Sequence, residues 1–297
     1  MSDQKFTDSV IEAMGPGTNP RMKEVLTSLI QHIHDFARDV NLTIPEWQMG
    51  MEFINQIGQM SDDKRSESIL VSDVLGLESL VDSLTYDTLE STDQKFTPSA
   101  IIGPFYREGS PHYKNGETII QQEVGGEKCY VSGKVTDAYG DPLSGATIEV
   151  WHTAPNGLYE QQDENQVEYN LRGTFTSDEN GDYSFICLKP TAYPIPYDGP
   201  AGQLLQIMER HPYRPSHIHW MVSKPGYRTL VTQIYDAQDP YTKNDSTFCV
   251  KGDLIVDFLP AKESLAKEKN VSCTLDYNIA LQTTEDFEKA KSKKTSN

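Results

Sequence analysis

The chain has 297 residues and a formal net charge of −18 at pH 7, which is long enough for two domains or one large one. So acidic a chain is a poor match for nucleic-acid backbones and anionic membrane surfaces, and neither is expected as its partner. Its four cysteines are widely separated, which excludes a zinc ribbon and indicates reduced thiols. The N-terminus lacks the pattern of a secretory signal and no apolar run reaches transmembrane length, so a cytoplasmic protein without membrane insertion is expected.

Residues 1 to about 95 are predicted to be helical. Apolar residues recur at helical spacing over residues 20–40, and two further helical segments follow. The last segment, from about Ser66, is apolar on much of its circumference, which predicts that it packs against a domain or another subunit on more than one side. His32 and His34 fall on the first helix, where residues two apart point in different directions, so they are not expected to bind a metal together.

The hydrophobic period changes after a connector at residues 97–111 that is rich in proline and glycine. Short alternating strands with turn signals follow and no helices are expected between them, which predicts an antiparallel β-sandwich. The fold class is therefore mainly β, with a helical N-terminal domain at 1–105, a β-sandwich domain at 106–262 and a C-terminal extension at 263–297 that covers the sandwich. Strands are expected at residues 130–137, 146–151, 173–176, 183–186, 217–223, 229–234, 248–251 and 255–259.

The strongest chemical signal is the sequence Arg214-Pro-Ser-His217-Ile-His219. On a strand, His217 and His219 point to one face and Ile218 to the other. Two imidazoles on one face can bind a divalent or trivalent metal, and Arg214 adds a permanent positive charge beside them. The alternative is a pair of core histidines hydrogen-bonded to the backbone, so this motif needs partners before it indicates a metal site.

Tyrosine is the candidate partner. No histidine is followed two residues later by an acid, so the usual ligand pattern of Fe(II) oxygenases is absent. Tyr159 and Tyr193 lie in predicted loops, and an anionic phenolate oxygen suits Fe(III) better than Fe(II) or Zn(II). However, a single tyrosine among fifteen is more often a packing residue with an amphipathic ring.

Residues from about 70 to 260 resemble the intradiol ring-cleaving dioxygenases. The matching stretches are Gly-Leu-Tyr159, Asn170-Leu-Arg-Gly-Thr-Phe-Thr-Ser-Asp, Lys189-Pro-Thr-Ala-Tyr193-Pro-Ile-Pro, Asp198-Gly-Pro, Arg214-Pro-Ser-His217-Ile-His219 and Thr232-Gln233-Ile-Tyr-Asp. A helical N-terminal third before a β-sandwich is similar to the catechol and hydroxyquinol branches of this family. The resemblance implies one non-haem Fe(III) ion per subunit, held by Tyr159, Tyr193, His217 and His219 with a solvent hydroxide.

The branch of the family depends on the pocket. Asp73 resembles the acidic residue that hydroxyquinol enzymes place near the third ring hydroxyl, although an N-cap before Val74 is an alternative role for it. Trp220 and the stretch Thr247-Phe248-Cys249 depart from the family's pattern and could reshape the pocket. The substrate-binding residues that the resemblance implies are Leu70, Asp73, Ile102, Gly103, Pro104, Phe105, Ile195, Pro196 and Thr247.

The resemblance implies that hydroxyquinol (benzene-1,2,4-triol) is cleaved by O2 between its two vicinal hydroxylated carbons, giving 3-hydroxy-cis,cis-muconate in the catabolism of aromatic compounds. Catechol, giving cis,cis-muconate, is the alternative substrate. By the family's pattern Tyr193 accepts a proton from the substrate, and Arg214, assisted by Gln233, stabilises the negative charge that develops. A structural ion pair is the ordinary alternative for Arg214.

The resemblance also implies a homodimer formed through the N-terminal helices, with lipid bound between the subunits. Two other classes of protein are alternatives. The stretch from Val131 to Ala146 resembles transthyretin-like sandwiches, which are non-enzymatic binding modules, and a zinc hydrolase would also use paired histidines.

Overall fold

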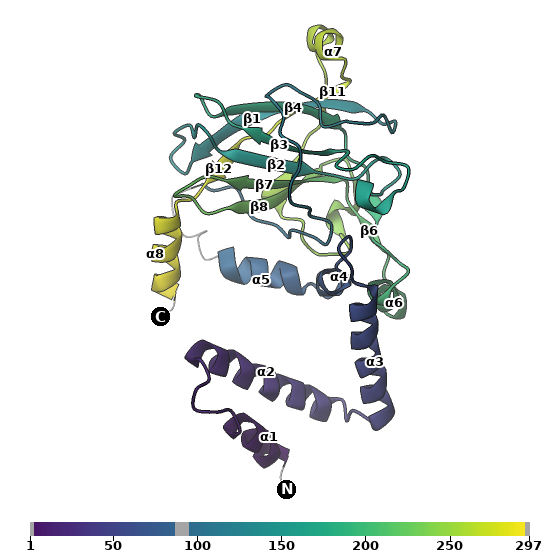
Figure 1. Ribbon diagram of the computed structural model, residues 1–297, viewed down its shortest axis with the longest axis vertical. Coiled ribbons are helices and arrows are strands. Elements are labelled where there is room, and N and C mark those ends of the chain that lie inside the picture. The colour runs from purple at the N-terminus through teal and green to yellow at the C-terminus, as the bar shows by residue number, and fades with distance from the viewer. Residues whose placement is uncertain (1–2, 87–94, 295–297) are drawn as a thin grey trace. The chain divides into compact units, whose positions relative to one another are not determined.

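The computed structural model describes residues 3–86 and 95–294 and divides the chain into two compact units, Met1–Gln56 and Ile57–Asn297. The first unit contains α1 (Asp3–Glu12), α2 (Pro20–Asp39) and most of α3 (Ile44–Met60), as Figure 1 shows. Asn19 caps α2, because its side-chain oxygen accepts a hydrogen bond from the backbone N–H of Arg21 at 3.0 Å.

The helical prediction for the N-terminal third is confirmed over residues 3–86, including the placement of His32 and His34 on α2, while its part at 87–94 lies outside the described residues. His34 joins α2 to α1, since its Nδ1 lies 2.9 Å from the hydroxyl of Thr7 and its ring stacks on Phe6. Within the single chain, no residue of α2 or α3 is buried. Their exposed apolar side chains are Met22, Val25, Leu29, Ile33, Phe36, Ile44, Trp47, Met49, Met51 and Ile54.

The second unit is a sandwich of two five-stranded sheets. One sheet has the order β10-β11-β1-β12, with β4 on the other side of β1, and the other has the order β3-β2-β7-β8-β9. The strands of the first sheet are β1 (Lys128–Asp137), β4 (Asp182–Leu188), β10 (Leu259–Pro260), β11 (Cys273–Asp276) and β12 (Ile279–Leu281). Those of the second are β2 (Thr147–Trp151), β3 (Arg172–Thr176), β7 (His217–Ser223), β8 (Leu230–Asp236) and β9 (Ile255–Val256).

The expectation of a purely antiparallel sandwich is wrong, because both sheets are mixed. Strand β1 pairs in parallel with β11 and with β12, and β8 pairs in parallel with β9. The first two of these pairings come from the segment expected to be a covering tail. Instead, its strands contribute Cys273, Leu275, Ile279 and Leu281 to the core between the sheets. Strands of three or four residues are too short to show a period in the sequence.

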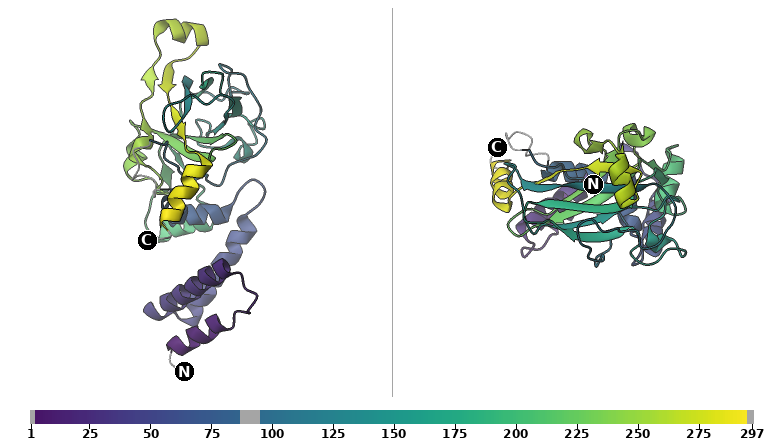
Figure 2. Two further views of the ribbon diagram at one scale, coloured as in Figure 1. Left: turned by 90° about the vertical axis from the view of Figure 1, so that its left-hand side faces the viewer. Right: turned by 90° about the horizontal axis from the view of Figure 1, so that it is seen from above.

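Helices flank the sandwich at several points (Figure 1). The predicted third helical segment is two helices, α4 (Glu67–Val74) and α5 (Leu77–Tyr86), since Gly76 between them has a φ of 72°. The other helices are α6 (Pro200–Ile207), α7 (Glu263–Lys269) and α8 (Thr284–Lys294), and Figure 2 shows α7 projecting beyond the sheets. Among the described residues, no helix is both long and apolar enough to cross a membrane.

The sandwich core explains why one of the expected pocket changes does not occur. Trp220 is fully buried between the sheets, where it meets Tyr183 edge-on at 5.6 Å. Strand alternation turns it away from the two histidines of β7, so the expectation that Trp220 reshapes the pocket is wrong. The strand expected at 248–251 is also absent, since Phe248 has a φ of 58° in a loop.

Candidate active site and metal centre

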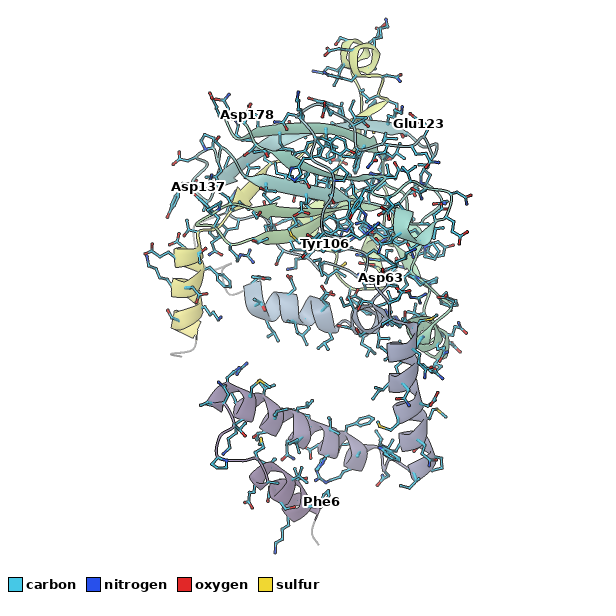
Figure 3. The ribbon with its side chains drawn as sticks, in the orientation of Figure 1. Phe6, Asp63, Tyr106, Glu123, Asp137 and Asp178 are labelled. Atoms are coloured by element: carbon cyan, nitrogen blue, oxygen red, sulfur yellow. The ribbon has the colours of Figure 1, made fainter. Side chains whose placement is uncertain are left out.

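Strand β7 carries the two histidines on one face. Both imidazoles are buried, at 2% exposure each, whereas Ile218 between them enters the sandwich core. Trp151, the register partner of His219 on β2, stacks on the His219 ring with 4.8 Å between centroids. Tyr106, labelled in Figure 3, packs against Trp151 in turn and donates a hydrogen bond to Glu149 at 3.3 Å. The sheet thus fixes both rings.

Tyr159 and Tyr193 approach the histidines from two different connections. Tyr159 immediately precedes a short 3-10 helix (Glu160–Gln162). The backbone N–H of Tyr159 donates a hydrogen bond to the side chain of Gln162 at 3.0 Å. Tyr193 begins β5 (Tyr193–Pro194), which pairs with β6 (Tyr213–Arg214). The loop before Tyr159 passes close to Tyr193: Gly157 has a φ of 83°, and a Cβ there would lie 2.9 Å from Cβ of Tyr193. A side chain at position 157 would push the two tyrosines apart.

The four side chains form a closed ring of donor atoms. The hydroxyls of Tyr159 and Tyr193 are 3.2 Å apart, and the hydroxyl of Tyr193 is 3.4 Å from Nε2 of His217. The Nε2 atoms of the two histidines are 3.2 Å apart, and that of His219 is 3.0 Å from the hydroxyl of Tyr159. Two ligands that each lie about 2.0–2.1 Å from one ion are themselves roughly 3 Å apart. The ring therefore fits a shared metal ion.

The protonation of the histidines also fits a metal. Nδ1 of His217 lies 2.7 Å from the carbonyl of Pro215, and because a carbonyl only accepts, Nδ1 carries the proton and Nε2 keeps its lone pair. Burial, followed by the charge of Arg214, lowers the pKa of His217. Burial, followed by His217, lowers the pKa of His219. Both rings are thus neutral at ordinary pH, the form that binds metals.

Tyrosine is essential to any metal site here. Burial raises the pKa of Tyr159, with Tyr193 as the next cause, and burial also raises the pKa of Tyr193, which Arg214 partly offsets. A phenolate in this place therefore requires a cation beside it. Over residues 3–86 and 95–294, no group of three or more His, Cys, Asp or Glu could hold a metal ion. A metal at this site would depend on the two phenolic oxygens.

A small pocket opens beside the donor ring. It is lined by Leu70, Asp73, Gly103, Pro104, Phe105, Tyr159, Tyr193, Ile195, Arg214, His219 and Thr247. The structure thus brings together seven of the nine side chains predicted to bind substrate. The exceptions are Ile102, whose backbone N–H donates to Glu78 at 2.9 Å, and Pro196, neither of which lines this pocket.

Asp73 is the unusual group in this pocket. It lies near the C-terminal end of α4, so the N-cap alternative is wrong. Its side chain is 1% exposed, and neither carboxyl oxygen makes a hydrogen bond of ordinary geometry with the described residues, although Glu78 lies close enough to interact with it. Burial, followed by the adjacent Glu78, raises the pKa of Asp73 to about 10. The carboxyl group is therefore protonated at neutral pH and is able both to donate and to accept a hydrogen bond.

Comparison with known protein families decides what kind of site this is. The family model described as "Dioxygenase" matches residues 101–283, and that described as "Catechol dioxygenase N terminus" matches residues 19–92. The chain belongs to the intradiol ring-cleaving dioxygenase family. It is an enzyme rather than a non-enzymatic sandwich module or a zinc hydrolase, and it acts on substrates of the catechol and hydroxyquinol type with O2. The family uses non-haem iron.

Individual relatives of this dioxygenase carry different substrate names. The chain is 54% identical to a catechol 1,2-dioxygenase of Candida albicans, over 97% of this chain and 95% of the relative. It is 40% identical to a 6-chlorohydroxyquinol 1,2-dioxygenase of Cupriavidus pinatubonensis, over 94% of this chain and 97% of that relative. The structure of a hydroxyquinol 1,2-dioxygenase from Pseudomonas putida matches with a TM-score of 0.81 and 37% identity, covering 95% of this chain and 98% of that one.

Several residues at the dioxygenase site were missed by the sequence analysis. Arg172 is 1% exposed, forms an ion pair with Glu160 at 2.7 Å, and places its guanidinium 5.5 Å from the ring centroid of Tyr159. Arg172 stands inside a matched stretch of sequence, which was the available signal. Asp245 pairs with Arg214 at 3.2 Å, and nothing in its sequence neighbourhood indicates this role.

Proposed function

We propose that this dioxygenase cleaves hydroxyquinol between its two vicinal hydroxylated carbons, using one Fe(III) ion held by Tyr159, Tyr193, His217 and His219. The ring of donor atoms supports this ligand set, because its two oxygens and two nitrogens are spaced for one ion. Bound Fe(III) would act as a Lewis acid toward the diol and prepare the ring for attack by O2. The product is a ring-opened dicarboxylic acid, 3-hydroxy-cis,cis-muconate.

Tyr193 is the proposed proton acceptor for the substrate. A vicinal diol that binds as a dianion must lose two protons. A phenolate already in the site can take one of them, and the solvent hydroxide that the family resemblance implies would take the other. Tyr193 lines the pocket, and its hydroxyl lies within 3.4 Å of two other donor atoms. The proton would move to the phenolic oxygen of Tyr193, while Tyr159, His217 and His219 keep their places.

Arg214 is proposed to stabilise the negative charge that develops on the substrate. Its guanidinium lines the pocket and is 3% exposed, so its charge acts in a medium of low dielectric constant. Gln233 acts through Arg214 rather than on the substrate: it is absent from the pocket wall, and its Oε1 accepts a hydrogen bond from Nη2 of Arg214 at 2.7 Å. The ordinary role of Arg214 in an ion pair also exists, with Asp245.

The observation that carries the choice of hydroxyquinol is the buried carboxyl of Asp73, which makes no hydrogen bond of ordinary geometry with the described residues. A buried polar group without a hydrogen bond costs roughly 1–3 kcal/mol. A third ring hydroxyl would satisfy the Asp73 carboxyl, whereas the bare C–H edge of catechol would leave it unsatisfied. The enzyme should therefore bind hydroxyquinol more tightly than catechol, because only hydroxyquinol can form this hydrogen bond with Asp73.

Catechol is the second candidate substrate, and a specific observation favours it as well. The relative from Candida albicans, at 54% identity, is named a catechol 1,2-dioxygenase. Both substrates share the vicinal diol that the donor ring would bind, so they differ only in what lies against Asp73.

Oxygen consumption by the iron-loaded enzyme tests the proposal, with hydroxyquinol and catechol at matched concentrations and a correction for autoxidation of hydroxyquinol. We expect a higher kcat/KM for hydroxyquinol, and we expect Asp73→Ala, which removes the carboxyl group, to reduce that preference by about 5-fold or more. A preference for catechol in the wild type, or an equal loss on both substrates in the variant, would leave Asp73 as a structural residue.

We also infer that the chain forms a homodimer through its N-terminal helices. The supporting observation is the exposed apolar residues on α2 and α3. In the other unit, α5 also exposes apolar side chains, namely Leu77, Leu80, Val81 and Leu84. Lipid between the subunits would occupy the same apolar surface. Light scattering with and without detergent extraction, followed by lipid analysis, tests both statements, and a monomer at micromolar concentration would contradict the first.

A further inference from the structure

A buried carboxylate lies behind the pocket and contacts none of the four donor atoms. Asp245 is 5% exposed, in the loop between two 3-10 helices, Pro240–Lys243 and Gly252–Leu254. Its Oδ1 accepts hydrogen bonds from Nε of Arg214 and from the backbone N–H of Thr247, each at 3.2 Å. Its Oδ2 accepts from Oγ1 of Thr247 at 3.0 Å and from Sγ of Cys249 at 2.9 Å. One carboxylate therefore binds both Arg214 and the segment 247–249.

On one side, Asp245 supplies the negative charge that Arg214 needs. A buried guanidinium without a counter-charge is strongly destabilising. Among the described residues, Asp245 is the acid that forms a salt bridge with Arg214, since the nearby Asp73 is held protonated by burial and by Glu78. Burial opposes ionisation of Asp245, yet the charge of Arg214 keeps its pKa below the ordinary value. The pair is therefore ionised.

The direction of the Arg214 side chain follows from this pair. Asp245 accepts hydrogen bonds from Nε and Nη2 of Arg214, and Nη2 also donates to Oε1 of Gln233 and to Sγ of Cys249. Nη1 is left facing the donor ring, 3.1 Å from Nε2 of His217. Losing the carboxylate would free the guanidinium to rotate or to pair elsewhere. A displacement of about 1 Å is enough to cost a large factor in rate at a catalytic group.

On the other side, Asp245 fixes part of the pocket wall. Thr247 lines the pocket and is 1% exposed. Its hydroxyl and its N–H are both committed to Asp245, and its carbonyl accepts a hydrogen bond from Ser79 of α5 at 3.0 Å. These hydrogen bonds hold Thr247 at a fixed place in the pocket wall.

We propose that Asp245 is a positioning residue that holds Arg214 and the Thr247 wall in a single arrangement, so that it sets both the rate of ring cleavage and the discrimination between diol substrates. This inference rests on the proposed role of Arg214. It assigns no direct contact between Asp245 and substrate.

The test compares Asp245→Asn with a matched control, Asp236→Asn. Asp236 is also buried, at 6% exposure, and is paired with Lys189 at 2.9 Å, but it does not line the pocket. We expect Asp245→Asn to retain full iron content and the visible absorption of the iron-loaded wild type, while kcat falls about 10- to 100-fold and the ratio of kcat/KM for hydroxyquinol and catechol changes. Asp236→Asn should change stability but neither kcat nor that ratio.

A double-variant cycle with Arg214→Met separates positioning from an independent effect. If Asp245 acts through Arg214, adding Asp245→Asn to Arg214→Met should lower kcat less than about 3-fold further. Asp245→Glu keeps the negative charge beside Arg214 but moves the carboxylate by one methylene group, and a fall in kcat of about 3-fold or more is expected. This second variant decides the inference if Asp245→Asn does not fold.

Three results would overturn the inference. They are an unchanged kcat in Asp245→Asn or, where that variant does not fold, in Asp245→Glu; losses that multiply fully in the double variant; or a loss explained by missing iron. If instead Arg214→Met itself leaves kcat unchanged, the proposed role of Arg214 fails and the inference falls with it.

Discussion

Tyr193 and Arg214 face each other as register partners across the two-stranded ladder of β5 and β6. This pairing joins a proposed proton acceptor and a proposed charge-stabilising group on one rigid element, although they lie 21 positions apart in the sequence. Both side chains enter the same pocket. The two-residue strands β5 and β6 therefore position these two side chains in the pocket rather than build the sandwich core.

Replacing Tyr193 by phenylalanine tests the proton-accepting role. The variant keeps the ring and removes one oxygen, so iron should remain bound by Tyr159, His217 and His219, while kcat should fall about 100-fold or more because the substrate loses its proton acceptor. Iron analysis and single-turnover kinetics check this. Tyr139→Phe, at an exposed turn position, is the control. Wild-type turnover in Tyr193→Phe would refute the role.

Asp73 should make stability depend on pH. Its folded pKa of about 10 lies above the ordinary value near 3.9, so between these values the folded state holds a proton that the unfolded state has released. The free energy of unfolding should therefore fall as pH rises from about 5 to 8, by up to about 1.4 kcal/mol per pH unit from this residue. Urea unfolding of wild type and Asp73→Asn checks it: the variant should gain relative stability with rising pH. A constant difference between the two would show that Asp73 is ionised in the fold.

The buried pair of Glu160 and Arg172 should be important for stability. Both side chains are almost fully buried, at 2% and 1% exposure, so Glu160→Gln leaves an uncompensated guanidinium next to Tyr159. A cost of about 3–5 kcal/mol in the free energy of unfolding is expected, with weaker retention of iron. Glu263→Gln removes a surface pair with Lys267 and should have no measurable effect. Equal stability of the two variants would contradict this account.

The C-terminal strands should behave as part of the core. Leu275 on β11 is 2% exposed and lies between the sheets, so Leu275→Ala should lower the free energy of unfolding by about 2–5 kcal/mol. Leu259→Ala, at a position that is 59% exposed, should have little effect. Chemical denaturation measures both. A neutral Leu275→Ala would mean that this segment only covers the sandwich.

The sequence was informative where one local pattern defined one structure. The alternation His217-Ile218-His219 predicted a strand with two imidazoles on one face, and β7 has those bounds and that alternation. The tyrosines needed the family resemblance, because the loops that carry them have no period. Asp73 was identified as a pocket residue in the same way.

Other features depend on contacts that no local pattern records. The parallel pairing of β1 with β11 and β12 joins segments about 140 residues apart, and the Arg214–Asp245 pair depends on a loop with no regular structure. The family resemblance placed Ile102 in the pocket, but Ile102 does not line it and its backbone N–H donates to Glu78 instead. Such errors arise where tertiary contacts, rather than periodicity, decide the position of a side chain.

The central claim is that two phenolate oxygens and two imidazoles hold Fe(III). A titration of metal-free protein with Fe(III), followed by visible absorption, tests it most directly. We predict a phenolate-to-iron absorption band that saturates at one ion per chain in the wild type and is greatly weakened in Tyr159→Phe. Iron binding without a visible band, or a band of equal strength in Tyr159→Phe, would contradict the account.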